Sequence, residues 1–124
     1  MIRVLFVCLG NICRSPMAEA VMRDLVTKRG LSSEIKVDSA GTASYHIGEP
    51  PHKGTKAKLQ QYGISTSGMS ARQLKRKDGE QFDYIVCMDA SNVENAREML
   101  GEAASSKVIR FLDLTSHKKD VPDP

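Results

Sequence analysis

The sequence predicts an α/β domain with a four-stranded parallel sheet flanked by helices, in a three-layer, Rossmann-like arrangement. An apolar run at residues 2–7 leads through a short glycine-containing turn into an amphipathic helix, and a second short strand follows. A strand, a helix and a strand at this spacing favour a right-handed parallel unit. Two further apolar runs of strand length, at residues 84–88 and 107–112, complete the predicted sheet.

The size and composition of the chain indicate one globular domain over residues 1–124. With 40% hydrophobic and 27% charged residues, the composition is that of a soluble protein. The net charge of +3 is too small to indicate nucleic-acid or membrane binding, and no apolar stretch is long enough to span a membrane. Three cysteines and no visible signal peptide favour a reducing, cytoplasmic location without a disulfide framework.

The first half of the chain alternates clear elements with loops. Residues 2–7 are almost continuously apolar, as in a central parallel strand, and residues 16–29 predict a helix. The apolar positions of this helix recur every four residues, at Met17, Val21 and Leu25. Residues 35–38 predict the second strand, and residues 39–51, rich in Gly, Ser and Pro, predict a loop.

The second half predicts two more helices and two more strands. Residues 53–62 form a polar helical segment that Gly63 ends, and residues 64–72 form a loop. Residues 84–88 predict the third strand, with Cys87 as an inert core thiol. A helix to about Leu100 follows, for which Asp89 and Ser91 are both N-cap candidates, and residues 107–112 predict the fourth strand.

The stretch between the first strand and its helix carries the chemistry of the chain. It reads Cys8-Leu9-Gly10-Asn11-Ile12-Cys13-Arg14-Ser15, with Pro16 next. A strand that runs through such a turn into a helix N-terminus forms a phosphate cradle, because its backbone N–H groups converge on one anion. Here the cradle also contains a thiol at its start and a guanidinium at its end.

Each residue type in this loop has a chemical reason. Cys8 supplies the nucleophile, and the N–H groups that hold phosphate also stabilise its thiolate. Arg14 presents a planar fork that matches two phosphate oxygens. Gly10 can take a positive φ angle where the turn is tightest, and Asn11 tolerates the left-handed region and can hydrogen-bond across the loop to hold it open.

Two further expectations concern the exit and the mouth of the loop. Ser15 fits the N-cap of the helix, with Pro16 at the first helical position, and its hydroxyl is placed to donate to the Cys8 sulfur. Ile12 has no polar role, and we expect it to line the mouth of the cradle.

At these residues the chain resembles the low-molecular-weight protein tyrosine phosphatases of bacterial type. The resemblance extends over essentially the whole chain through segments in the family's order: DSAGT at 38–42, GEPPH at 48–52, ARQ at 71–73, FDYIVCMD at 82–89 and VPDP at 121–124. It implies hydrolysis of phosphotyrosine in proteins or peptides through a phosphocysteine intermediate, without a metal or cofactor. It also implies a monomer that phosphate-like oxyanions inhibit.

The resemblance assigns the catalytic roles. Cys8 attacks phosphorus while Arg14 and the N–H groups of residues 9–14 hold the equatorial oxygens. Asp123 then protonates the leaving oxygen and later takes a proton from the hydrolytic water. Tyr45 and Ile12 are expected to form the substrate slot. Cys13, five residues after Cys8, is a possible redox partner that would form a reversible disulfide with it.

Three alternatives stay open on the same scaffold. Protein-arginine phosphatases tend to carry threonine where Ile12 stands, and an apolar side chain beside Tyr45 suits a phenyl ring better. Arsenate reductases need another downstream cysteine pair, whereas only Cys87 is available. The chain stops at Pro124, where the family continues into a C-terminal helix, so we expect an incomplete domain, and an inactive phosphate- or phosphoprotein-binding module is the third alternative.

One position departs from the family pattern. Many relatives place a histidine just before the Ala-Arg-Gln segment, where it supports the loop asparagine. This chain has Met69 and Ser70 there, which leaves the support of Asn11 open.

Overall fold

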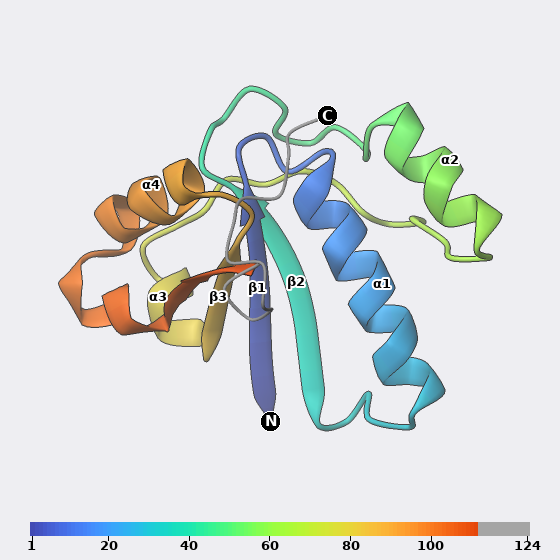
Figure 1. Ribbon diagram of the computed structural model, residues 1–124, viewed down its shortest axis with the longest axis horizontal. Coiled ribbons are helices and arrows are strands. Elements are labelled where there is room, and N and C mark those ends of the chain that lie inside the picture. The colour runs from blue at the N-terminus through green and yellow to red at the C-terminus, as the bar shows by residue number, and fades with distance from the viewer. Residues whose placement is uncertain (112–124) are drawn as a thin grey trace.

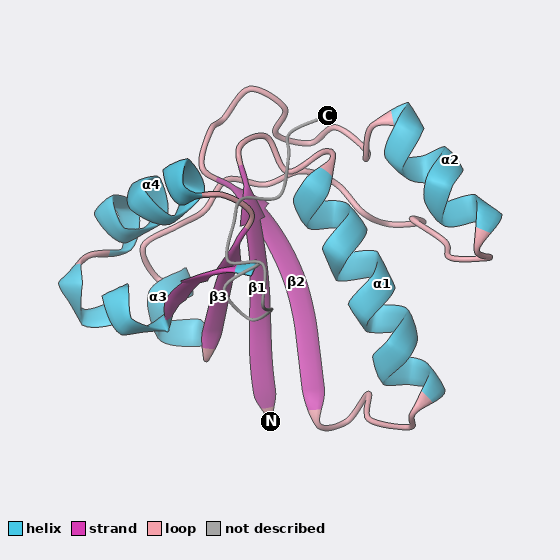
Figure 2. Ribbon diagram, viewed as in Figure 1, coloured by secondary structure: helices cyan, strands magenta, loops and turns pink. Residues whose placement is uncertain are grey.

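The computed structural model describes residues 1–111 and contains four strands, four α-helices and one 3-10 helix in that range (Figure 2). In chain order these are β1 (Ile2–Cys8), α1 (Arg14–Lys28), β2 (Ile35–Gly41), α2 (Lys53–Gln61), α3 (Asp78–Gln81), β3 (Tyr84–Cys87), α4 (Ala90–Leu100), η1 (Glu102–Lys107) and β4 (Val108–Arg110). The predicted α/β class is confirmed.

The sheet is parallel throughout, with strand order β2-β1-β3-β4 (Figure 1). The chain therefore leaves β1 toward β2 on one side and later returns to β3 on the other side. Ligands of open parallel sheets bind where the order reverses in this way, beyond the carboxyl ends of the strands. The loop that follows β1 lies at that point, at the top of Figure 1.

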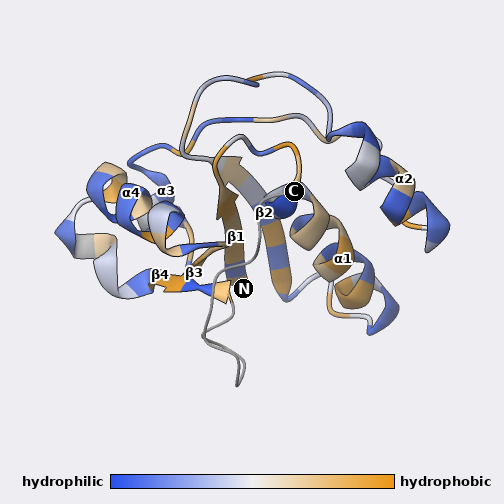
Figure 3. Ribbon diagram, turned by 45° about the horizontal axis from the view of Figure 1, so that its top comes forward, coloured by the Kyte–Doolittle hydropathy of each residue, from blue (hydrophilic) through white to orange (hydrophobic). Residues whose placement is uncertain are grey.

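The central strand β1 is apolar on both faces from Val4 to Val7 because helices cover both faces of the sheet (Figure 3). In β1, Leu5 and Val7 belong to the cluster on the α4 side, whereas Val4 and Phe6 belong to the cluster that includes Val26 of α1. This alternation is the two-residue period of a strand. The central strand is thereby clamped on both sides, and the loop at its end has a rigid base.

The observed element boundaries differ from the predicted ones in several places. Helix α1 begins at Arg14 instead of residue 16, and β2 continues to Gly41, three residues beyond the predicted strand end. The short helices α3 and η1 were not predicted, and β4 ends at Arg110. Asp89, and not Ser91, is the N-cap of α4, because its carboxylate accepts the N–H of Asn92 at 2.7 Å.

Cys87 lies in the core between β1 and β4, and is completely buried. Burial raises the pKa of its thiol to about 12, with the nearby charge of Asp89 adding to the effect. Cys87 is therefore a neutral thiol, as expected from its position in a strand. Within residues 1–111, no helix is both long and apolar enough to cross a membrane.

Candidate active site

The loop after β1 is held in place by backbone N–H groups of neighbouring segments, which donate to carbonyl oxygens on the outer side of the loop. Three of these accept backbone N–H groups at distances between 2.7 and 3.0 Å: Cys8 from Thr42, Leu9 from Ala43 and Ile12 from His52. In a trans peptide, the C=O of one residue and the N–H of the next point in opposite directions. The N–H groups of Leu9, Gly10 and Cys13 therefore point away from these partners, toward the hollow of the loop, which suits an anion.

The sulfur of Cys8 sits at the base of this hollow. Its Sγ lies 3.0 Å from the hydroxyl of Ser15 and accepts the N–H of Asn11 at 3.3 Å. The side chain is almost fully buried, yet it lines a cavity of about 130 Å³ together with Leu9, Gly10, Ile12, Cys13, Arg14, Tyr45 and His46. A thiolate in this position is stabilised by two hydrogen-bond donors and by the N-terminus of α1.

The predicted contact between Ser15 and the Cys8 sulfur is present, but the predicted N-cap role is wrong. Ser15 lies in the first turn of α1, whose N-cap position is occupied by Cys13 without a side-chain hydrogen bond. The Ser15 hydroxyl is instead committed to Cys8 and to the Asn11 amide. A capping bond to the helix backbone would have turned this hydroxyl away from the sulfur.

Arg14 reaches the same cavity from the first residue of α1. Its Nη1 donates to the carboxylate of Asp89 at 2.7 Å, and its side chain is only 6% exposed. Asp89 thus caps α4 with one oxygen and orients the guanidinium with the other. Sequence reasoning assigned Asp89 only the cap. Its position directly after β3, the strand beside β1, was the available signal, because parallel strands end at the same edge of the sheet.

Asn11 is the residue that holds the loop in shape. It has a φ angle of +58°, as predicted for the left-handed region. Its Oδ1 accepts the backbone N–H of Arg72 at 3.0 Å, and its Nδ2 donates to Ser15 and Ser39, each at 2.9 Å. These contacts answer how Asn11 is supported in a chain with Met69 and Ser70 before the Ala-Arg-Gln segment.

Gly10 has a different role from the predicted one. Among residues 1–111 the glycines with positive φ do not include Gly10, because Asn11 takes the left-handed conformation instead. A Cβ at Gly10 would lie 2.9 Å from the His46 ring, and a Cβ at Gly41 would lie 2.7 Å from the Leu9 carbonyl oxygen. Both glycines allow close packing around the loop. The contribution of Gly41 was not predicted.

The wall opposite the loop contains Tyr45 and His46. Tyr45 is 75% exposed, and its ring meets the His46 ring edge-on at 6.5 Å between centroids. The His46 Nδ1 is paired with Glu49 at 2.9 Å, which anchors the ring against the loop. The structure therefore brings Tyr45 and Ile12 to one cavity with Cys8, as predicted, and adds His46, which sequence reasoning treated as a surface or loop-anchoring residue.

The predicted general acid Asp123, with Pro122 and Pro124, lies outside the described residues. No group of three His, Cys, Asp or Glu side chains in residues 1–111 is arranged to hold a metal ion.

Comparison with known proteins identifies the class of protein that this fold and site define. Residues 3–124 match the family described as low molecular weight phosphotyrosine protein phosphatase. The chain belongs to this family and is a phosphatase, an enzyme class that suits the anion-binding loop, the buried thiol and the oriented guanidinium described above.

Three bacterial proteins illustrate what the chain is similar to. The chain is 56% identical to the low molecular weight protein-tyrosine-phosphatase YfkJ of Bacillus subtilis, covering 100% of the chain and 81% of the relative. The YfkJ crystal structure superimposes with a TM-score of 0.96, at 55% identity and over 100% and 79% of the two chains.

Two less similar proteins extend the comparison. PtpA of Staphylococcus epidermidis, also named a low molecular weight protein-tyrosine-phosphatase, is 47% identical over 100% of this chain and 79% of its own length. Wzb of Vibrio vulnificus, solved in complex with benzylphosphonate, is 29% identical with a TM-score of 0.86, over 99% and 81% of the two chains.

Proposed function

We propose that the chain hydrolyses phosphotyrosine in proteins or peptides, with Cys8 as nucleophile and Arg14 as the principal ligand of the transferred phosphoryl group. The observation that carries this assignment is the Cys8 sulfur, hydrogen-bonded to Ser15 and Asn11 in the same cavity as Arg14. The names of YfkJ and PtpA support the substrate class.

The proposed reaction has two steps. The Cys8 thiolate attacks phosphorus in line, forming the S–P bond as the P–O bond to the phenol breaks, and Asp123 supplies the proton to the leaving oxygen. Water then attacks the phosphocysteine, losing a proton to Asp123, and the thiolate leaves with its charge stabilised by the Ser15 hydroxyl. The loop N–H groups and Arg14 hold the equatorial oxygens, where charge accumulates in the transition state.

The substrate preference provides a direct test of the proposed function. With Ile12 and Tyr45 on the cavity wall, we expect kcat/KM for a phosphotyrosine peptide to exceed that for the matched phosphoarginine peptide at least about tenfold, because an apolar wall favours a phenyl ring over a guanidinium. The measurement is phosphate release from both peptides by one preparation, with vanadate as inhibitor. Equal or reversed preference would favour the protein-arginine phosphatase, and no turnover of either peptide would favour a binding module.

Asp123 is the proposed general acid, supported by its place in the VPDP segment that resembles the family. We expect Asp123→Ala to lower kcat about 100-fold for phenyl phosphate, whose leaving group needs a proton, and much less for p-nitrophenyl phosphate. Asp113→Ala is the matched control, since it also removes an aspartate from the C-terminal part of the chain. Equal losses on the two esters would contradict the acid role.

The proposal also covers redox chemistry at the loop and the cellular setting. Cys13 lines the same cavity as Cys8, which supports a role as redox partner for the nucleophile under peroxide. We also propose a cytoplasmic, reducing environment, because the nucleophile must remain a free thiol, and a monomer, which follows only from the resemblance to the family.

A further inference from the structure

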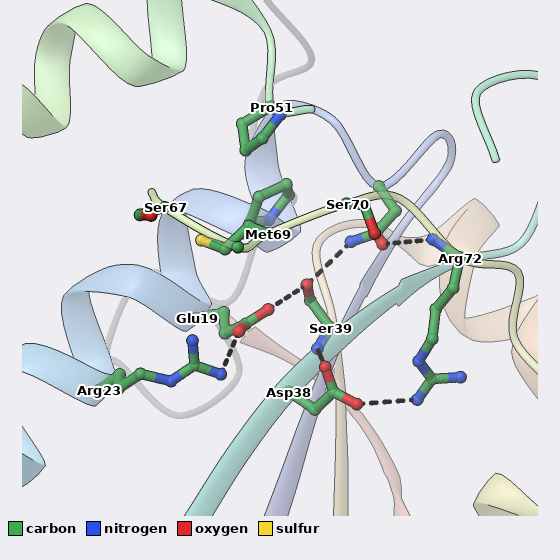
Figure 4. A pocket seen from close by; sticks show the side chains of 12 residues that line it. Glu19, Arg23, Asp38, Ser39, Pro51, Ser67, Met69, Ser70 and Arg72 are labelled. Carbon is green, nitrogen blue, oxygen red and sulfur yellow. Dashed lines mark hydrogen bonds and ion pairs between the residues drawn. The ribbon is translucent and has the colours of Figure 1, made fainter. Parts of the chain in front are cut away.

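A continuous chain of side-chain hydrogen bonds links the Cys8 sulfur to a buried carboxylate on α1. From Cys8 it passes to Ser15 (3.0 Å), to the Asn11 amide (2.9 Å) and to Ser39 (2.9 Å). It ends at Glu19, whose Oε1 accepts the Ser39 hydroxyl at 2.5 Å (Figure 4). The Glu19 residue is only 5% exposed, although it belongs to none of the motifs that the sequence suggested.

When Cys8 is a thiolate, which can only accept, the donors and acceptors along these hydrogen bonds have one consistent arrangement. The Arg72 N–H can only donate, so the Asn11 atom that it contacts is the carbonyl oxygen, and both amide hydrogens face the serines. Ser39 and Ser15 therefore accept from Asn11. Each serine has one proton left, which Ser39 gives to Glu19 and Ser15 gives to the Cys8 sulfur.

We propose that Glu19 is a positioning residue for the reaction, because its carboxylate fixes the proton of Ser39 and thereby orients the Asn11–Ser15–Cys8 hydrogen bonds that stabilise the thiolate. A carboxylate accepts and never donates, so the Ser39 proton has a single destination. The Glu19 carboxylate polarises the Ser39 hydroxyl, which makes its oxygen a better acceptor and strengthens the Asn11–Ser39 hydrogen bond that holds the Asn11 amide in place. The proposal rests on the proposed role of Cys8 as nucleophile.

The charged groups around Glu19 come from three elements. On α1, Arg23 forms an ion pair with the Oε2 of Glu19 (Figure 4). On β2, Asp38 accepts the backbone N–H of Ser39. In the loop before α3, Arg72 forms an ion pair with Asp38. Burial raises the pKa of Glu19, and the Ser39 hydrogen bond and the Arg23 charge partly offset this effect. Arg23 is thus the cation that faces the buried carboxylate and, after the Ser39 hydrogen bond, opposes the effect of its burial.

The carboxylate also borders a solvent-accessible space. A cavity of about 310 Å³ is lined by Glu19, Ser39 and Asn11 and also by Met69, Ser70 and Pro51. Figure 4 shows the labelled side chains around this cavity, with Met69 on the opposite side from Asp38. A variant that neutralises Glu19 leaves these walls in place, so it changes the charge at the end of the chain and not the packing of the loop.

The test is a double-mutant cycle between Glu19 and Ser15, in which the measured quantity is the reactivity of the Cys8 sulfur. The variants are Glu19→Gln, Ser15→Ala and both together, with Asp24→Asn as the matched control, since Asp24 is another α1 carboxylate with an i,i+4 partner, Lys28. The measurement is the rate of Cys8 alkylation by iodoacetamide against pH, in Cys13→Ser backgrounds. Thermal unfolding of each variant is followed in parallel.

Below the midpoint pH of alkylation, Glu19→Gln is expected to slow the reaction about threefold, and Ser15→Ala about tenfold. The double variant should equal Ser15→Ala alone, because the effect of Glu19 passes through Ser15. The Asp24 control should match the parent. Additive effects, or an unchanged midpoint in a folded Glu19→Gln protein, would overturn the proposal.

A second variant covers the case in which Glu19→Gln does not fold. Ser39→Ala interrupts the same series of hydrogen bonds at the residue between Glu19 and Asn11. It must slow Cys8 alkylation to the same extent and show the same lack of additivity with Ser15→Ala. If Ser39→Ala alkylates like the parent, the proposal is wrong. Alkylation needs no turnover, so a failure of the nucleophile assignment is seen separately, as phosphatase activity retained by Cys8→Ser.

Discussion

Replacing Cys8 by serine is expected to lower kcat for p-nitrophenyl phosphate by at least about 10⁴-fold, because an alcohol at this position is neither ionised nor nucleophilic enough to attack phosphorus. The variant should still bind inorganic phosphate, because the binding groups are backbone N–H groups and the Arg14 guanidinium. Turnover and phosphate binding, measured by release of p-nitrophenol and by calorimetry, separate these two effects.

Cys87→Ala is the matched control for this experiment. It removes a thiol from the end of the neighbouring strand, paired in register with Val7, one residue before Cys8. Since the Cys87 thiol is buried, neutral and outside the cavity, we expect kcat within about twofold of the parent, with a modest loss of thermal stability. Retention of activity by Cys8→Ser, or equal inactivation by both changes, would refute the assignment of the nucleophile.

The central loop was predictable because its parts are contiguous in the sequence. Cys8, Arg14 and Ser15 are brought together by one turn between a strand and a helix, and the spacing alone places them around one anion. The central strands β1 and β3 were predictable for a similar reason, since a strand covered on both faces is a nearly continuous apolar run. Both inferences depend on local pattern and on rules that hold for parallel sheets in general.

The groups that support the loop were harder to predict, because several of them come from distant parts of the chain and only the strand order brings them to the loop. Asp89 is 75 residues from Arg14, and the Arg72 N–H is 61 residues from Asn11. Serine, glutamate and aspartate are common surface residues, and nothing in the local pattern around Ser39 or Glu19 indicates burial. Their roles follow from which strand ends lie next to β1, and the strand order decides that.

The conformation of the loop illustrates the same limit at a single residue. The sequence allowed a positive φ angle at Gly10, the residue with the lowest steric cost, as well as at Asn11, and of the two only Asn11 adopts it. The side chain of Asn11 has three hydrogen bonds in this conformation, and these outweigh the intrinsic preference. Helix α3 is a parallel case, since Asp78 accepts both the Lys75 N–H and the Arg72 guanidinium, contacts that only the folded chain provides.

Arg14→Lys is the second change for which we expect a large effect, a loss of about 10²- to 10³-fold in kcat/KM for aryl phosphates. The substitution keeps the positive charge and removes the planar fork. Asp89 accepts a hydrogen bond from one amino group of this fork, and this contact fixes the plane of the guanidinium relative to the Cys8 sulfur. An ammonium group paired with Asp89 has no such plane, so it cannot direct two donors at the equatorial oxygens.

The effect of Arg14→Lys on phosphate affinity is expected to be smaller than its effect on catalysis. Charge accumulates on the equatorial oxygens in the transition state, so the fork should matter more for kcat than for the affinity of phosphate, which we expect to fall only about tenfold. Arg97→Lys is the matched control, because Arg97 lies on α4 and donates to the Val108 carbonyl away from the cavity. Equal losses in phosphate affinity and in kcat/KM would mean that Arg14 only binds the substrate and does not favour the transition state.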